Sequence, residues 1–210
     1  MIKIVTFDIF DTCLIRASGS PESVFRLLAR KVTTGAKGDI LDFIRVRKDG
    51  EYNARVSSKR EVTLDEIYEH CNFSSLSKMT NNDIMRIEMD IERDVLVPVE
   101  RIRNIIARHR KQGARIGFIS DMYLSAEFLK SILKEKGLYE EGDLLLVSSE
   151  SKKTKAQGSL YKLLKDKYPE ARFGTWLHYG DNLRSDCLNS MKAGALPIIV
   201  NHRKNDSEII

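Results

Sequence analysis

The chain has 210 residues, of which 42% are hydrophobic and 31% charged, so it is long enough to bury a globular core. Its net charge of +5 is mild and evenly spread, which argues against nucleic acid as a partner and is compatible with a small anionic substrate. The three cysteines are widely spaced with no CxxC pair, which excludes a disulfide framework and favours a reducing, cytoplasmic location. We expect no signal peptide and no membrane span, because no apolar run approaches ~18 residues.

A short apolar strand is expected over residues 2–7, and it leads directly into an acidic turn that contains Asp8 and Asp11. A buried, unpaired carboxylate is strongly destabilising, so Asp8 at the end of a buried strand needs a partner or a metal ion. The turn alone is equally compatible with both aspartates as ordinary turn residues. The rest of the chain has to decide between these interpretations.

The segment from residue 16 to residue 98 is expected to form helices and no strand. Its signals include a capping box at Thr63–Glu66, where a hydroxyl and a carboxylate cap a helix start reciprocally. Arg47, Glu51 and Arg55 lie four residues apart on one face of another helix. They indicate either a surface ladder of ion pairs or anchors for an anionic substrate.

After Pro98 the pattern changes to strands that alternate with helices. Such alternation predicts right-handed crossovers and a parallel sheet that is covered by helices on both faces. We therefore predict an α/β fold, a Rossmann-like parallel sheet with an inserted all-helical cap. The expected core is residues 1–15 and 99–210, and the expected cap is residues 16–98. The strands predicted after Pro98 are residues 114–120, 144–148, 175–179 and 196–200.

Polar side chains follow the ends of several predicted strands. Each has a plain interpretation as a turn, capping or solvated residue, but ligands bind at the carboxyl ends of parallel strands, where all of them would meet. His178 and Trp176, within a strand, are expected to be a packed, hydrogen-bonded histidine and a core residue. The strand-end residues are Asp8 and Asp11, then Ser120 and Asp121, then Asp181 and Asp186, with Lys155 in a nearby loop.

These residue types suit phosphoryl transfer. Carboxylates are the hard oxygen ligands that Mg²⁺ prefers, and Asp8 can act as a covalent nucleophile. Lys155 would neutralise charge on the transferring group, and the Ser120 hydroxyl would donate to a phosphate oxygen. The predicted substrate is a small phosphorylated metabolite.

Four segments resemble, in order, the four motifs of the haloacid dehalogenase (HAD) superfamily, most of whose members are Mg²⁺-dependent phosphatases. The resemblance implies that Asp8, the backbone carbonyl of Phe10, Asp181 and Asp186 hold Mg²⁺, that Ser120, Asp121 and Lys155 bind the phosphate, and that the insertion is a type 1 cap. The four segments are Phe7–Thr12, Phe118–Asp121, Lys155 with Gly158 and Tyr161, and Gly180–Asp186.

The residues of the first two motifs are most similar to those of a bacterial branch of the superfamily that is found with surface-polysaccharide glycosyltransferases. This resemblance implies such an enzyme as a partner or a fused domain. Arg16, just past the acidic turn, is expected to bind substrate at the mouth of the site. The chain is predicted to hydrolyse small phosphomonoesters, such as sugar phosphates, through an aspartyl-phosphate.

One position departs from the phosphatase pattern. Family phosphatases carry a second aspartate two residues after the nucleophile, as the acid and base for the leaving group, and this chain has Phe10 there. Asp11, one residue later, is the expected substitute. Dehalogenases of the family also carry an aromatic residue at that place, so a hydrolytic 2-haloacid dehalogenase is one alternative. The other is a weakly active or inactive binding module accessory to polysaccharide biosynthesis.

Overall fold

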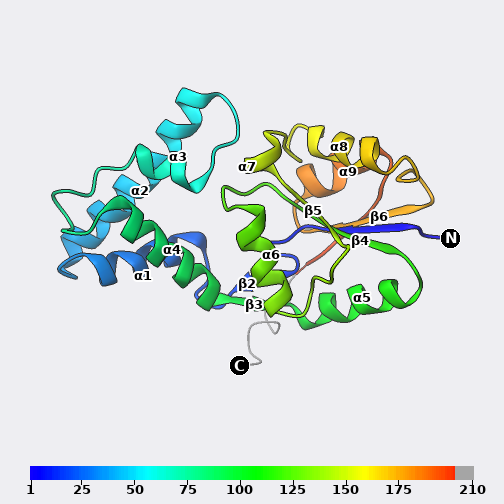
Figure 1. The fold of residues 1–210 in the computed structure, drawn as a ribbon, viewed down its shortest axis with the longest axis horizontal. Coiled ribbons are helices and arrows are strands. Elements are labelled where there is room, and N and C mark those ends of the chain that lie inside the picture. Colours follow the sequence, from blue (N-terminus) through cyan, green and yellow to red (C-terminus); the bar gives the residue numbers. More distant parts are fainter. Residues whose placement is uncertain (202–210) are drawn as a thin grey trace. The chain divides into compact units, whose positions relative to one another are not determined.

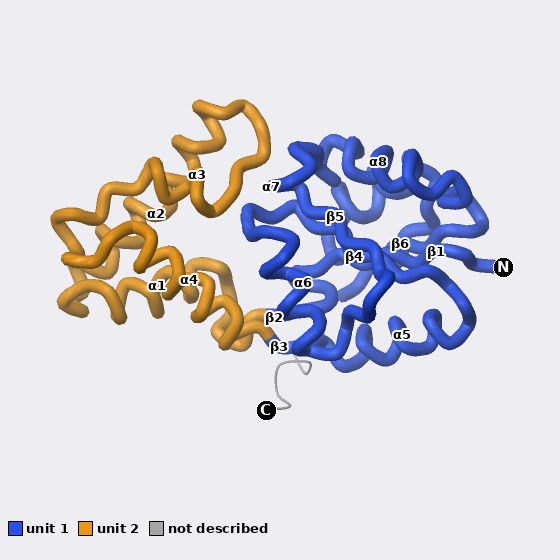
Figure 2. Tube along the Cα trace, viewed as in Figure 1, with its two compact units in different colours: residues 1–15, 97–210 blue, residues 16–96 orange. Residues whose placement is uncertain are grey.

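The computed structural model describes residues 1–201 of the chain. It consists of two compact units, drawn in different colours in Figure 2. One unit combines Met1–Ile15 with Val97–Ile210, and the other is the intervening segment Arg16–Leu96. The second unit is therefore an insertion into the first, immediately after the first strand and its acidic turn.

The larger unit is built on a five-stranded sheet in which every neighbouring pair is parallel. The strand order is β5-β4-β1-β6-β7, so the first strand of the chain lies in the centre. This arrangement confirms the predicted α/β, Rossmann-like fold. The strands are β1 (Ile4–Phe7), β4 (Arg115–Ser120), β5 (Leu144–Val147), β6 (Trp176–Gly180) and β7 (Leu196–Ile199).

Helices cover both faces of this sheet, with α8 and α9 on one side and α5 on the other (Figure 1). The face under α8 packs around Trp176 and Tyr161, which are fully buried together with Ile4 of the central strand. Trp176 is thus a core residue, as expected. The helices of this unit are α5 (Glu100–Lys111), α6 (Ala126–Glu135), α7 (Ser148–Ser151), α8 (Ser159–Lys167) and α9 (Ser190–Ala193).

The segment between β6 and β7 is not a single α-helix. It begins as a π-helix, η1 (Leu183–Asn189), and continues as α9 only from Ser190. The wider turn is visible in the bond from the Cys187 amide to the Asn182 carbonyl, at 3.2 Å. Single π-turns are rare and often lie at functional sites, and this one contains Asp186.

The inserted unit is a small bundle of four helices, α1 (Pro21–Val32), α2 (Lys37–Ser58), α3 (Leu64–Glu69) and α4 (Asn81–Val95). The predicted capping box is present, since the Thr63 hydroxyl and the Glu66 carboxylate each accept a backbone amide of the other. Arg47, which was expected either in a surface ladder of ion pairs or as an anchor for an anionic substrate, is fully buried and makes two bonds of 2.8 Å to the carboxylate of Glu88. Arg55 pairs with Glu51 in the predicted i,i+4 manner.

The prediction that residues 16–98 contain no strand is wrong at both ends of the segment. The chain enters and leaves the insertion through β2 (Leu14–Arg16) and β3 (Leu96–Pro98), which form a two-stranded sheet. Each strand is only three residues long, so neither has enough alternation to be recognised in the sequence. Pairing becomes evident only when the two crossing segments lie side by side.

Within residues 1–201, no helix has the length and apolar character that a membrane crossing requires.

Candidate active site

The register of the sheet brings three strand ends together. Phe7, the last residue of β1, is paired with Phe118 of β4 on one side and with Tyr179 of β6 on the other. Asp8 follows directly, and its amide donates to the Tyr179 carbonyl at 2.8 Å. The ends of β4 and β6, with Ser120 and with the Gly180–Asp186 segment, therefore flank Asp8. The predicted edge of the sheet is the place where these side chains meet.

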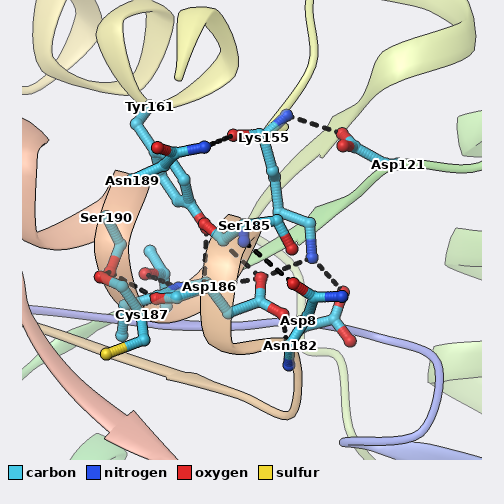
Figure 3. A network of polar contacts seen from close by, with 12 residues as sticks. Asp8, Asp121, Lys155, Tyr161, Asn182, Ser185, Asp186, Cys187, Asn189 and Ser190 are labelled. Atoms are coloured by element: carbon cyan, nitrogen blue, oxygen red, sulfur yellow. Dashed lines mark hydrogen bonds and ion pairs between the residues drawn. The ribbon is translucent and has the colours of Figure 1, made fainter. Parts of the chain in front are cut away.

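A buried ammonium group lies at the centre of the cluster (Figure 3). Lys155 Nζ donates to Asp8 Oδ1 and, at 2.7 Å, to Asp186 Oδ1. The three residues are at most 5% exposed. Charges this deeply buried are stable only when they are paired, so the lysine and the two carboxylates stabilise one another's charged forms.

The ionisation of the two carboxylates differs. Burial raises the pKa of Asp8 to about 7, helped by the charge of Asp186 and opposed by Lys155. Burial also disfavours the charged form of Asp186, but hydrogen bonding from His178 and the charge of Lys155 outweigh it and hold this pKa well below its usual range. The pKa of Lys155 lies above its usual value, because the attraction of Asp8 and Asp186 exceeds the effect of burial. Asp186 is thus the fixed anion of the group.

Asp181 completes a set of three carboxylates. One oxygen each from Asp8, Asp181 and Asp186 lies within 4.8 Å of the others, with Asp181 exposed and the other two buried. Burial and the neighbouring charge of Asp186 raise the pKa of Asp181. Hard oxygen ligands that repel one another at this spacing fit Mg²⁺, which relieves the repulsion and commonly retains several water ligands. The donor set therefore fits the predicted metal.

The position of Asp186 depends on the glycine at the end of β6. A Cβ at Gly180 would lie 2.4 Å from the Cβ of Asp186, a distance that no side chain tolerates. The Asn182 amide donates to Asp186 Oδ2 at 3.1 Å. The hydroxyl of Tyr161 lies 3.3 Å from Asp186 Oδ1. The Gly-Asp pair of the fourth motif thus includes a steric requirement as well as a ligand.

The loop that carries Lys155 is clamped from two sides, as Figure 3 shows. Both oxygens of Asp121 accept backbone amides of this loop, from Lys155 at 2.7 Å and from Ala156 at 3.1 Å. The amide of Asn189 donates to the carbonyls of the same two residues, at 3.0 and 2.8 Å. Asp121, which was expected to bind substrate, therefore holds the lysine loop, and its contact with substrate stays a prediction.

Asp11 lies in the turn after Asp8 and is exposed. Its backbone is left-handed, with φ 54°, and its amide donates to the Leu14 carbonyl at 2.8 Å. Aspartate is among the few residues that tolerate this conformation. The charge of Asp11 helps to raise the pKa of Asp181, so the two carboxylates lie close enough to interact. Asp11 is thus beside the cluster without belonging to it.

The remaining predicted residues lie in different surroundings. Ser120 is buried at the carboxyl end of β4, and Phe10 is half-buried in the turn after Asp8. Arg16 lies in the helical unit, where its guanidinium forms a buried pair with Glu92, with bonds of 3.0 and 2.9 Å. A guanidinium held in this way stabilises the insertion, so we do not count Arg16 among the substrate-binding groups.

Two polar residues of the site carry no recognisable signal in the sequence. Asn182 is the N-cap of η1, and its side-chain oxygen accepts hydrogen bonds from the backbone amides of Arg184 and Ser185. Its backbone amide donates to the Asp186 carboxylate. Asn189 clamps the lysine loop through its side chain. Spacing along the chain could not identify Asn189, because its partners lie more than thirty positions away.

The sequence matches no family model and no curated protein. Solved structures are similar in fold, each at low identity. An L-2-haloacid dehalogenase from Xanthobacter autotrophicus superposes with a TM-score of 0.65 at 13% identity, over 99% of this chain and 80% of that one. A HAD-hydrolase from Bacillus subtilis, solved with bound magnesium, gives a TM-score of 0.61 at 15% identity, over 93% and 87% of the two chains.

A third similar structure is a HAD-family enzyme from Bacteroides thetaiotaomicron in complex with magnesium and inorganic phosphate. It superposes with a TM-score of 0.61 at 11% identity, over 96% of this chain and 95% of that one. The similarity covers nearly the whole length of both chains. At such identities it establishes the fold.

Proposed function

We propose that this chain, which has the fold of the haloacid dehalogenase superfamily, is a Mg²⁺-dependent hydrolase of small phosphomonoesters, with sugar phosphates as the substrate class. The observation that carries the proposal is the set of three carboxylates of Asp8, Asp181 and Asp186, with the buried ammonium of Lys155 on two of them. Such a set combines a nucleophile, a metal site and a positive charge at one edge of the sheet.

Asp8 is the nucleophile in this proposal. Its carboxylate attacks the phosphorus atom, the bond between phosphorus and the ester oxygen breaks, and the alcohol leaves with a proton from an acid or from water. Water then attacks the aspartyl-phosphate, which releases inorganic phosphate and restores Asp8. A bound Mg²⁺, held by Asp8, Asp181, Asp186 and the Phe10 carbonyl, would neutralise charge on the phosphate oxygens.

Lys155 favours the ionised form of Asp8 and offers positive charge to the transferring phosphoryl group. Since its backbone is clamped by Asp121 and Asn189, its ammonium is positioned before substrate arrives. Ser120, at the end of the neighbouring strand, offers a hydroxyl donor. Electrostatic positioning of this kind supplies most of the catalysis in phosphoryl transfer.

Protonation of the leaving group is assigned to Asp11. Asp11 has a carboxyl group, which can donate a proton, and it lies close enough to Asp181 to interact with it. Phe10 occupies the position of the usual acid and cannot donate a proton. General acid catalysis is worth roughly 10²–10⁴-fold and matters most for poor leaving groups. With Asp11 as the acid, its contribution should be largest for substrates whose alcohols leave poorly, such as sugar phosphates.

The test is phosphate release from an aryl phosphate and from a panel of phosphorylated metabolites, with Mg²⁺ and with EDTA. The proposal requires release that depends on Mg²⁺ and is lost in Asp8→Asn. The exposed Asp42→Asn, the same chemical change in the helical unit, is the matched control and should leave the rate unchanged. Failure to release phosphate from any member of the panel would count against the proposal.

A second candidate is hydrolytic dehalogenation, in which Asp8 would attack carbon and displace halide. Phe10 favours it, because the aromatic residue occupies the position that phosphatases give to their acid. The fold similarity to haloacid dehalogenases is also as strong as that to the magnesium-bound hydrolases. Halide release from a 2-haloacid that is unaffected by EDTA would select this reaction.

One further outcome is informative. Binding of Mg²⁺ and phosphate by calorimetry, without turnover of any substrate, would indicate a binding module in place of an enzyme. Partnership with a glycosyltransferase stays a prediction from the sequence.

A further inference from the structure

A chain of buried hydrogen bonds lies behind Asp186, within the sheet. The indole Nε1 of Trp176 donates to the hydroxyl oxygen of Thr6 at 2.8 Å. The same oxygen lies 2.8 Å from Nδ1 of His178, its cross-strand partner on β6. The three residues are fully buried, so none of these groups can exchange its partner for water. The hydrogen-bond pattern must therefore be satisfied within the protein.

The other ring nitrogen of His178 faces the active site. Nε2 lies 3.2 Å from Asp186 Oδ1 and 3.0 Å from the hydroxyl of Tyr161. An ionised carboxylate can only accept hydrogen bonds, so the contact with Asp186 requires a proton on Nε2. The Tyr161 hydroxyl has its own acceptor, the Ser185 carbonyl at 3.0 Å. The contacts on this side are all satisfied when Nε2 is the donor.

The contacts of Nδ1 are compatible with the same tautomer. Thr6 already accepts from Trp176, and its single proton can point to Nδ1 at 2.8 Å or to the Leu177 carbonyl at 3.3 Å. Because the Thr6 oxygen could also accept from Nδ1, the contacts of Nε2 decide between the two tautomers. If Nδ1 carried the proton instead, two acceptors, Nε2 and the Asp186 oxygen, would face each other at 3.2 Å.

This bond matters for the site because Asp186 Oδ1 also accepts from Lys155. A rotation of the Asp186 carboxylate would break both bonds and move the metal-facing oxygen. Partners that orient a ligand from behind typically change metal affinity by 10–100-fold. His178, which is fully buried in β6, is thus placed to fix the Asp186 carboxylate.

We propose that His178 is a positioning residue, in the Nε2–H tautomer and supported by Trp176 and Thr6, that holds the Asp186 carboxylate for Mg²⁺ and for Lys155. The part that concerns Mg²⁺ rests on the proposed function. The tautomer does not, since it follows from contacts within the metal-free protein.

The first measurement is the tautomer of His178 in the unaltered, metal-free protein, from the ¹⁵N shifts and two-bond couplings of its ring. The chain has four histidines, so the loss of one set of signals in His178→Gln assigns the residue. We expect a neutral ring with the proton on Nε2. A proton on Nδ1, or an imidazolium, overturns the positioning role alone.

The second measurement is Mg²⁺ affinity by calorimetry in two variants of Thr6. Thr6→Val removes the hydroxyl with little change in shape and is expected to weaken Mg²⁺ binding about tenfold or more, with the ring signals of His178 altered. Thr6→Ser keeps the hydroxyl and should bind within about twofold of the unaltered protein. A purely structural Thr6 would lower the melting temperature of Thr6→Val but leave both readouts unchanged.

Each outcome decides a separate point. Mg²⁺ affinity that is equal in Thr6→Val and Thr6→Ser overturns the link from Thr6 through His178 to the metal site. Absence of Mg²⁺ binding in the unaltered protein overturns the proposed function and, with it, the metal part of this proposal.

Discussion

The buried ion pair of the inserted unit gives a prediction whose size follows from the structure. Arg47 and Glu88 are fully buried, and two bonds of 2.8 Å join them, with the Tyr68 hydroxyl donating to the same carboxylate at 2.7 Å. Glu88→Gln removes the negative charge that meets two of the guanidinium's bonds, and Glu51, at 3.5 Å and partly exposed, is then the carboxylate that still faces the buried guanidinium. Loss of one partner of such a pair destabilises proteins by roughly 3–5 kcal/mol.

For a chain of this length, about 1 kcal/mol lowers the melting temperature by ~2–4 °C, so Glu88→Gln should lower it by roughly 6–20 °C. Differential scanning calorimetry measures the change. Glu22→Gln is the matched control, since it alters an equally charged residue whose partners, Arg26 and Lys48, are exposed. Exposed pairs contribute ~0–1 kcal/mol, so this variant should shift by a few degrees at most.

A third variant separates lost attraction from lost packing. Replacing both partners, as Arg47→Met with Glu88→Leu, removes the charges and keeps the volume, so stability should recover most of the loss. The reasoning is refuted if Glu88→Gln melts no lower than Glu22→Gln. It is also refuted if the double variant is less stable than Glu88→Gln, because that result would show that the charges are not what the site requires.

Three further predictions concern the active site. Gly180→Ala should displace Asp186 and weaken Mg²⁺ binding by at least about tenfold in calorimetry, whereas Gly38→Ala, whose Cβ meets no atom within 4 Å, should not. Because the pKa of Asp8 is raised to about 7 in the metal-free protein, this carboxyl is protonated below that pH. Mg²⁺ affinity should therefore rise with pH up to about 7, and Mg²⁺ binding should release protons. Calorimetry in buffers of different ionisation enthalpy measures the number of protons released. Asp11→Asn should reduce kcat roughly 10²–10⁴-fold for alkyl phosphates and much less for aryl phosphates.

The sheet and the residues at its edge could be predicted because local patterns determine them. Strands such as β1 and β4 are short, mostly apolar runs, each followed directly by an aspartate, and parallel strands bring such ends together. Asp8, Lys155, Asp181 and Asp186 were therefore predicted to lie together, and in the structure they do so.

The hydrogen-bond partners of two predicted site residues could not be identified from the sequence. Arg16 lies just after the acidic turn, but its partner Glu92 is 76 residues away, and their pairing draws the guanidinium into the helical unit. Asp121 was expected to bind phosphate because of its place in the second motif, yet backbone amides 34 and 35 positions later donate to its oxygens. A role that depends on which donors arrive from elsewhere cannot be read from the residue and its neighbours.

The charge of the cluster bears on the choice between the two reactions. Displacement of halide by Asp8 needs one ionised carboxylate, which Lys155 already stabilises. Lys155 offsets one of the three negative charges, so two remain without a divalent cation. Burial raises the pKa of Asp8 to about 7, and the charges of Asp186 and Asp181 add to this effect. One divalent cation balances the three carboxylates and the ammonium completely. In a metal-dependent reaction every charge of the cluster is therefore balanced. In a metal-free reaction the charges of Asp181 and Asp186 would only disfavour ionisation of the nucleophile Asp8.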